Sequence, residues 1–266
     1  MIQTSHRPRK RFGQHFLHDG GVIAKIVDTI APQSGERLVE IGPGLGALTI
    51  PLLQRHGRLE VVELDRDLIP LLVERCLEVG ALVVHQGDAL RFDFTALASG
   101  ERIRLVGNLP YNISTPLLFH LLDHSAVIDD MHFMLQKEVV DRMAASAGDD
   151  AYGRLSVMLA ARCAVQPLFE IGPGAFTPPP KVDSAIVRLV PHRQPPFALG
   201  DPERFARIVN QAFSMRRKTL RNALRGLVDA EGIEAAGLDP GARPETVSPE
   251  AFGRLAATSG ATPDSR

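Results

Sequence analysis

Apolar and polar positions in the first half of the chain alternate between two periods. Over residues 20–30 the apolar side chains recur on one helical face, which predicts a helix. Two more helices are predicted, one beginning near Ala47 and one over 68–79. Short apolar runs between them predict strands at 37–41, 59–64, 82–85 and 103–106. Strands and helices that alternate at this spacing predict an α/β fold with a doubly wound, mostly parallel sheet of the Rossmann-like type.

The second half of the chain first continues this pattern and then becomes helical. Its predicted elements are a strand at 132–135, a helix at 137–145, and strands around 155–169 and at 184–190. Three successive prolines predict a stiff loop over 176–181. The proline-rich segment 192–201 is interpreted as a linker, and apolar residues at helical spacing over 205–213 predict an amphipathic helix after it.

These patterns divide the 266-residue chain into three parts. We expect an α/β domain with a basic N-terminal arm over 1–192, a small helical domain over 201–258 and a loose tail over 259–266. No apolar run is long enough to span a membrane and no signal core follows the basic N-terminus, so a cytoplasmic protein without a membrane partner is expected. Two cysteines are too few for a zinc cluster, so no metal is expected.

The charges are unevenly distributed, although the net charge is only −1. Seven Arg or Lys residues and no Asp or Glu occur between residues 204 and 228. Arg217, Arg221 and Arg225 recur every four residues, which predicts a basic stripe along a helix that Lys218 widens. The opposite side of this helix would be anchored by Leu220, Leu224 and Leu227. Such a face is often merely solvated, but the absence of intervening acids favours a phosphate-binding surface.

Glycines follow the first predicted strand at Gly42, Gly44 and Gly46. At a strand-to-helix turn, glycine lets the backbone pass close to a ligand, while the start of the helix offers free amide donors. Glu63 ends the next strand, where its carboxylate can accept both hydroxyls of a ribose. Asp88 ends the third strand, where it can accept from an adenine amine. The pattern predicts a site for a nucleoside-bearing cofactor.

The glycines alone leave the identity of this cofactor open. Gly42, Gly44 and Ala47 also satisfy the dinucleotide fingerprint, so an NAD-dependent dehydrogenase is an alternative. No proton-relay constellation for a dehydrogenase is visible in the sequence. The full glycine spacing behind Glu40, together with Asp88 and the motif after the fourth strand, favours S-adenosylmethionine.

Asn108, Leu109, Pro110 and Tyr111 follow the fourth strand and resemble the Asn-Pro-Pro-Tyr motif of methyltransferases that modify exocyclic amines. The N6 lone pair of adenine is conjugated with the ring, so acceptors around the amine are needed to draw it toward tetrahedral geometry. The Asn108 side-chain oxygen and the Leu109 carbonyl are the candidate acceptors. Pro110 would fix the direction of that carbonyl, and Tyr111 offers a flat face to an extruded base. Taken alone, the tetrapeptide is equally well explained as a strand-ending turn.

The segments around this motif favour the catalytic interpretation. In chain order they are residues 12–17, the glycine loop, 87–90, 108–113, 176–184 and 212–222. Over residues 11–224 this series resembles the ribosomal RNA adenine dimethyltransferase family, and within it the small-subunit branch. The resemblance implies the fold of S-adenosylmethionine-dependent methyltransferases, with residues 1–192 as the catalytic domain and 201–258 docking on ribosomal RNA.

The resemblance also implies roles for individual residues. Those that would contact the cofactor are His15, Leu17, Gly42, Gly44, Glu63, Asp88 and Asn108. Phe176, on the proline loop, would sandwich the target adenine with Tyr111, although an aromatic residue before a turn can also be an ordinary core residue. Met215 stands where the family more often has Gln.

The implied substrate is a pair of adjacent adenosines in the 3′-terminal hairpin loop of 16S rRNA, within a partly assembled 30S subunit. Each adenosine would receive two methyl groups, and we expect the enzyme to act as a monomer. A large-subunit (23S) rRNA adenine methyltransferase of the antibiotic-resistance type shares nearly the same motifs, but residues 216–222 favour the small-subunit enzyme. An RNA-binding relative that keeps the site without using it is disfavoured by the intact motif at 108–111.

Overall fold

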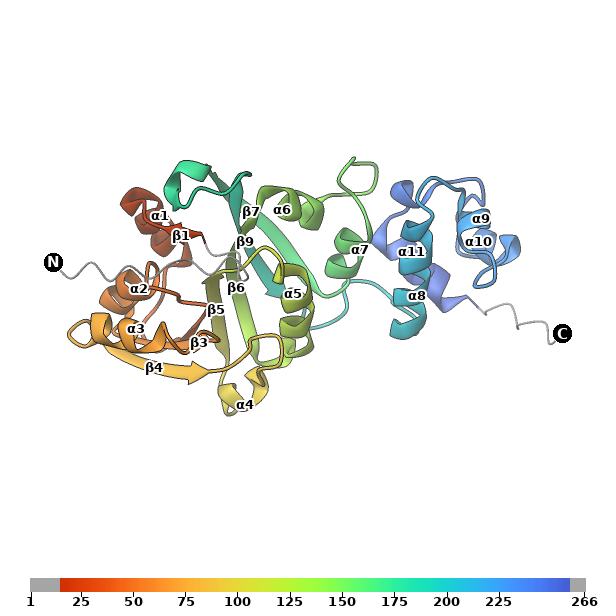
Figure 1. Cartoon of the computed structure of the whole chain (residues 1–266). Helices are drawn as coiled ribbons and strands as arrows, with labels where there is room; N and C mark the ends of the chain where they lie inside the picture. The colour runs from red at the N-terminus through yellow and green to blue at the C-terminus, as the bar shows by residue number, and fades with distance from the viewer. Residues whose placement is uncertain (1–14, 259–266) are drawn as a thin grey trace. The chain divides into compact units, whose positions relative to one another are not determined.

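A seven-stranded sheet forms the core of one of the two compact units of the computed structural model, which describes residues 15–258 (Figure 1). Neighbouring strands in the sheet follow the order β4-β3-β2-β5-β6-β9-β7. All pairs from β4 to β6 are parallel, and β9 pairs antiparallel with β6. The strands are β2 (Arg37–Ile41), β3 (Arg58–Glu63), β4 (Ala81–Gln86), β5 (Ile103–Asn108), β6 (Ile128–Gln136), β7 (Cys163–Ile171) and β9 (Ser184–Pro191). The predicted Rossmann-like, mostly parallel sheet is confirmed.

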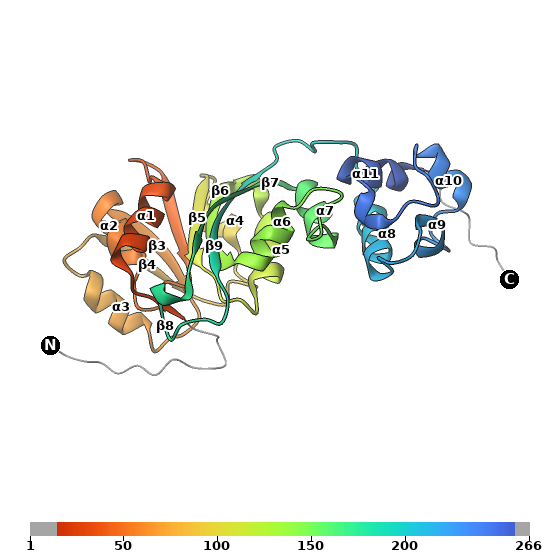
Figure 2. The same cartoon turned by 90° about the horizontal axis from the view of Figure 1, so that it is seen from above.

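Helices cover both faces of this sheet (Figure 2). On one face lie α1 (Gly20–Ile30), α2 (Thr49–His56) and α3 (Ile69–Cys76), and on the other α4 (Phe94–Ala98) and α5 (Ser114–Asp123). The Asp19 carboxylate caps α1 by accepting from the Val22 amide at 3.0 Å, and the helix buries Ile26 and Val27 in the core. Short 3₁₀ helices cover Ser125–Val127, Pro173–Ala175 and Pro244–Thr246.

The strand order reverses between β2 and β5, and there the two strands approach closely. A β-carbon on Gly107 of β5 would lie 2.5 Å from the carbonyl oxygen of Ile41 on β2. Only glycine therefore permits this spacing, immediately before Asn108. In open α/β sheets a crevice for ligands lies at such a reversal, beyond the carboxyl ends of the strands.

A second, two-stranded sheet joins the start of the described chain to the proline loop. β1 (Phe16–Leu17) pairs antiparallel with β8 (Phe176–Thr177), with Leu17 opposite Phe176. The amide of His18 also donates to the carbonyl of Ala175 at 2.9 Å. The segment before α1 is thereby fixed beside a loop that follows it by about 160 residues.

The chain divides into two compact units, and the boundary differs from the expected one. The second unit contains residues 141–165 as well as the chain from 192 onward. Its helices are α7 (Arg154–Ala160), α8 (Pro202–Ser214), α9 (Leu220–Ala223), α10 (Ala230–Ala235) and α11 (Pro249–Ala257), and α6 (Lys137–Ala144) crosses the boundary. Segment 141–165, expected in the α/β domain, belongs here because Tyr152 and Val157 pack into the core of this unit. The Tyr152 hydroxyl also donates to the carbonyl of Val247 at 2.7 Å.

The strand predicted around 155–169 is wrong in its first half. Residues 154–160 form α7, and β7 begins only at Cys163. A short apolar run does not distinguish a buried helix from a buried strand, and here packing in the helical core decides for the helix. Apart from the helix expected to carry the basic stripe, the other predicted helices and strands are present, with ends that differ by a few residues.

The continuous helix predicted to carry Arg217, Arg221 and Arg225 is also wrong. α8 ends at Ser214, a turn follows, and α9 is a single turn, Leu220–Ala223. Thr219 is extended and caps α9, and the first two amides of α9, those of Leu220 and Arg221, donate to the carbonyls of Ala242 and Pro240. Leu220 and Leu224 are buried as expected. The arm at 7–11 and the tail at 259–266 lie outside the described residues.

Candidate functional site

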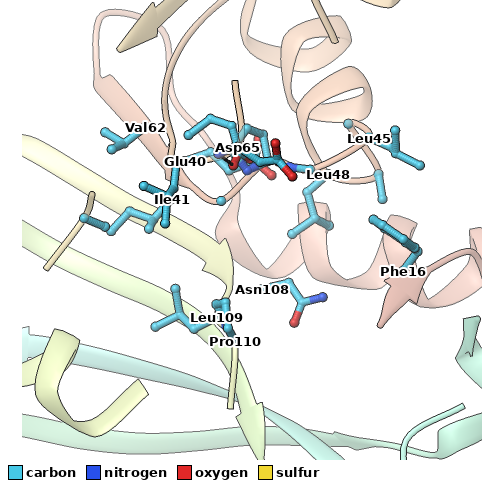
Figure 3. A pocket seen from close by; sticks show the side chains of 18 of the residues that line it. Phe16, Glu40, Ile41, Leu45, Leu48, Val62, Asp65, Asn108, Leu109 and Pro110 are labelled. Atoms are coloured by element: carbon cyan, nitrogen blue, oxygen red, sulfur yellow. Dashed lines mark hydrogen bonds between the residues drawn. The ribbon is translucent and has the colours of Figure 1, made fainter. Parts of the chain in front are cut away.

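A cavity of about 750 Å³ opens at the carboxyl ends of β2, β3 and β5 in the α/β unit. Glu40 and Asp65 lie on one wall, Asn108 and Pro110 on another, and Phe16 on a third (Figure 3). All seven residues expected at the cofactor line this cavity: His15, Leu17, Gly42, Gly44, Glu63, Asp88 and Asn108. The rest of the tetrapeptide, Leu109 to Tyr111, also lines it. The structure thus brings together segments separated by up to about 100 residues, as the parallel sheet predicts.

The glycine loop takes a conformation that other residues avoid. Gly42, Gly44 and Gly46 have φ angles of 65°, 56° and 88°, in the left-handed region. The Gly42 amide donates to the carbonyl of Val62 at 2.9 Å, and the Gly44 amide donates to the Glu63 carboxylate at 3.2 Å. The loop therefore lies against the end of β3, where its three glycines border the cavity without side chains of their own.

Glu63 ends β3 with its carboxylate almost fully buried, at 6% exposure. One oxygen accepts from the amide of Asp65 at 2.7 Å and the other from Gly44 at 3.2 Å. Burial raises the pKa of Glu63, and the two backbone bonds work against that shift. Since a carboxylate can accept about four hydrogen bonds, each oxygen retains capacity for a hydroxyl donor.

Glu40, in β2, is a buried carboxyl on the cavity wall that the sequence identified only as the residue leading the glycine loop. Its Oε2 accepts from the Thr49 hydroxyl at 2.6 Å. Burial raises the pKa of Glu40 to about 8, and the nearby Glu63 raises it further, against the effect of the Thr49 bond. No sequence signal indicated Thr49 as the partner of this carboxyl.

Asp88 follows β4 in a tight turn at the cavity. Its Oδ1 accepts from the amide of Leu90 at 3.0 Å, a bond that fixes the carboxylate without using its second oxygen. The apolar residues Leu64 and Leu90 also line the cavity, and Leu64 is 52% exposed. A carboxylate acceptor beside apolar surface suits a flat heterocycle that carries an amine.

The motif at 108–111 is fixed at both ends. Asn108 is the last residue of β5, and its Nδ2 donates to the main-chain carbonyl of His15 at 3.4 Å. The hydroxyls of Tyr111 and Ser184 are 2.6 Å apart in a hydrogen bond. Burial raises the pKa of Tyr111, so the phenol remains neutral at physiological pH. Ser184, which the sequence did not single out, thus fixes the tyrosine from β9.

Phe176 is not placed as expected. Its side chain is 3% exposed and packs in the core with Leu17 and Ile171, and it is not among the residues that line the cavity. The structure therefore does not bring Phe176 and Tyr111 together as two faces of one site. The aromatic ring that lies against Tyr111 is that of His15.

The four basic residues expected at RNA lie in the helical unit. Arg217, Lys218, Arg221 and Arg225 are all exposed, on the turn after α8 and on and beyond α9. Within residues 15–258 no group of three or more His, Cys, Asp or Glu side chains is arranged to hold a metal ion. No helix in the same range is both long enough and apolar enough to cross a membrane.

The parallel sheet, the glycine loop and the strand-end acids define a Rossmann-like methyltransferase of the S-adenosylmethionine-dependent class. Two solved structures are similar to most of the chain, each at 28% identity. A dimethyladenosine transferase from Plasmodium falciparum has a TM-score of 0.78 over 91% of this chain and 96% of its own. The 23S rRNA methyltransferase ErmE has a TM-score of 0.71 over 90% of this chain and 97% of its own.

Sequence comparison defines the family. The family model for ribosomal RNA adenine dimethylase matches residues 5–258, and the chain belongs to this family. It is 60% identical over 252 residues to Ribosomal RNA small subunit methyltransferase A of Pseudomonas aeruginosa, covering 94% of each chain. It is 60% identical to the protein of the same name from Methylococcus capsulatus, covering 91% of this chain and 94% of the relative. The predicted family and enzyme class are confirmed, and the large-subunit alternative is not favoured.

Proposed function

We propose that this enzyme dimethylates N6 of two adjacent adenosines in the 3′-terminal hairpin loop of 16S rRNA, within the 30S subunit. The observation that carries the proposal is that the 108–111 motif lines the same cavity as the glycine loop, Glu63 and Asp88. The small-subunit name of its close relatives supports the small ribosomal subunit as the substrate.

The cavity fits S-adenosylmethionine in size and in the chemistry of its walls. The glycine loop offers close backbone approach for the methionine end, and Glu63 retains acceptor capacity for the ribose hydroxyls. Asp88, beside Leu64 and Leu90, suits the adenine ring and its amine. His15, Leu17 and Asn108 complete the lining. The bound cofactor supplies an electrophilic methyl group on a sulfonium.

Asn108 and Leu109 would act on the target amine. Acceptors at the Asn108 Oδ1 and the Leu109 carbonyl hold the two N6 hydrogens, which draws the nitrogen lone pair out of conjugation. The bond from Asn108 Nδ2 to the carbonyl of His15 supports this, because it turns the amide so that Oδ1 is left for the amine. No strong general base is needed, since the methylated ammonium is itself acidic and loses its proton to water.

Tyr111 would hold the extruded base by stacking. Its ring is fixed through the bond to Ser184, so the base meets a rigid face. Two-fold methylation requires the base to remain or rebind after the first transfer, and N6 still carries one hydrogen for the acceptors at that stage.

The helical unit would dock on ribosomal RNA through the exposed side chains of Arg217, Lys218, Arg221 and Arg225. Buried Leu220 and Leu224 anchor this segment, so its cations are presented to solvent and to phosphates. We expect the enzyme to act as a monomer, which analytical ultracentrifugation will check.

The test is methylation of small subunits that lack these modifications, followed by mapping of the modified bases. We expect dimethylation at two adjacent adenosines near the 3′ end of 16S rRNA and none on large subunits. Calorimetric titration should show binding of S-adenosylmethionine and none of NAD. Methylation confined to 23S rRNA, or preferential binding of NAD, would overturn the proposal.

A further inference from the structure

His15 makes three contacts beside the motif at 108–111. Its imidazole stacks on the ring of Tyr111, with centroids 5.9 Å apart and planes inclined by 29°. Its Nδ1 forms a hydrogen bond of 2.7 Å with the carbonyl oxygen of Pro178 on the proline loop. Its own carbonyl accepts from Asn108 Nδ2 at 3.4 Å. The residue thus connects the segment before β1 to both ends of the motif and to the loop opposite.

His15 and Tyr111 both line the cavity, so the imidazole stacks on Tyr111 at the site where a target base would enter. The tyrosine cannot swing away to offer another face, because its hydroxyl is bonded to the buried Ser184. Phe176 offers no alternative surface, since it is packed in the core. A base held between two rings needs them about 7 Å apart, twice the contact distance of stacked carbons. The 5.9 Å between His15 and Tyr111 leaves no room for an adenine.

We propose that His15 is a positioning residue for the target base: its imidazole keeps the stacking face of Tyr111 covered in the free enzyme, and the extruded adenine takes that face in exchange. The proposal rests on the proposed function, in which Tyr111 stacks with adenine. This exchange makes the site selective for the base that enters it. A base gains stacking energy on balance only where it overlaps the Tyr111 ring more than the imidazole of His15 does. A two-ring purine meets this condition better than a pyrimidine does.

The stack can be observed directly, because the chain contains two tyrosines and no tryptophan. In Tyr152→Phe, Tyr111 is the only tyrosine, and its emission reports on its neighbours. Adding His15→Asn to this background should raise the emission and alter its quenching by iodide, as the ring becomes uncovered. Tyr152→Phe with Tyr111→Phe should lose the emission. An emission unaffected by His15→Asn would show that the two rings do not stack in solution and would overturn the proposal.

The exchange itself is tested by steady-state kinetics of His15→Asn on small subunits that lack the modification, at saturating S-adenosylmethionine. Asparagine keeps the main-chain carbonyl for Asn108 and can still donate to Pro178, but it has no ring. We expect KM for the subunit to fall about 2- to 12-fold, the range that corresponds to about 0.5 to 1.5 kcal/mol for an aromatic pair. His18→Asn is the matched control, because His18 is exposed and only its amide donates to the loop.

Each other result is decisive. A raised KM would show that the His15 ring contacts the bound base, and an unchanged KM would show that the ring has no role. Either result would overturn the proposal. Calorimetry with S-adenosylhomocysteine separates these effects from a change in cofactor affinity. Should the unmutated enzyme fail to methylate adenosine, the proposed function fails, whereas the emission measurement still reads the His15 contact.

Discussion

The two polar atoms of the Asn108 side chain have different roles. Its Nδ2 donates to the main-chain carbonyl of His15, and its Oδ1 is left to accept from the substrate. We expect Asn108→Ala to reduce kcat by about 10² to 10³, because the acceptor acts mainly in the transition state. Binding of S-adenosylmethionine should change little. Single-turnover kinetics with calorimetry check both parts, and a rate equal to that of the unmutated enzyme would remove the assignment.

Glu40 gives a pH-dependent stability. Its pKa is about 8 in the folded protein and 4.5 when unperturbed, so between these values the folded state binds a proton that the unfolded state has released. Stability is therefore lost as pH rises through this window, at up to about 1.4 kcal/mol per pH unit. Glu40→Gln keeps an acceptor for Thr49 and does not titrate, so the stability of this variant should fall less as pH rises.

Denaturant unfolding of both proteins between about pH 5 and pH 8 measures this difference directly. The free energy of unfolding of the unmutated protein should fall relative to that of Glu40→Gln across the whole range. Parallel pH profiles would mean that Glu40 is ionised in the folded state.

The residues expected at the cofactor line one cavity because of where they stand in the chain. Gly42, Glu63 and Asp88 each stand at the carboxyl end of a strand or just beyond it, and parallel strands end at one edge of a sheet. Phe176 and Ser184 could not be assigned in this way. Whether an aromatic ring faces a cavity or a core depends on packing against distant residues such as Leu17, which periodicity does not report.

At the scale of elements, the contact between β2 and β5 fixes where Asn108 stands. Gly107→Ala would place a β-carbon 2.5 Å from the Ile41 carbonyl oxygen, so one of the two strands must shift. We expect a loss of about 1 to 3 kcal/mol in the free energy of unfolding and a lower kcat, as the motif moves with its strand. Gly174→Ala, where an added β-carbon meets nothing within 4 Å, is the control. Equal stability of the two variants would contradict the argument.

The basic segment after α8 shows where helical periodicity misleads. Spacing of four residues placed three arginines on one stripe, but α8 ends before Arg217, and α9 begins only after the extended Thr219. The sequence could not show this, because the first amides of α9 are satisfied by Pro240 and Ala242, about 20 residues later. The exposed cations therefore follow a bent surface rather than a straight line.

Replacement of Arg217, Arg221 and Arg225 by Ala should weaken binding to small subunits and flatten its salt dependence. The log-log slope should fall by roughly one unit for each lost phosphate contact. Affinity for S-adenosylmethionine should not change. Replacement of Arg58, Arg66 and Arg91, three exposed arginines of the α/β unit, controls for net charge. An unchanged slope in the triple variant would mean that these residues only face solvent.

At the scale of the whole molecule, the helical unit is discontinuous in sequence, and composition gave no sign of this. The proline-rich linker at 192–201 suggested a single domain boundary there. Tyr152 and Val157, however, pack with Phe205, Ile208 and Leu220. A fragment of residues 1–192 should therefore expose apolar surface, bind a hydrophobic dye and aggregate. A fragment that ends at residue 258 should remain folded with full cofactor affinity. A monomeric, cooperatively unfolding 1–192 fragment would contradict this.

The same discontinuity sets an order of events during synthesis. The segment 141–165 emerges from the ribosome well before α8 and α11, the helices on which it packs. At roughly 5 to 20 residues per second, the interval is about 5 to 20 seconds. For about the first half of that time, until α8 is complete, α7 has an apolar face and no partner on which to pack, and a chaperone could bind there. The folding of this protein, itself expected to act on ribosomes, would thus depend on how quickly a ribosome translates the last quarter of its chain.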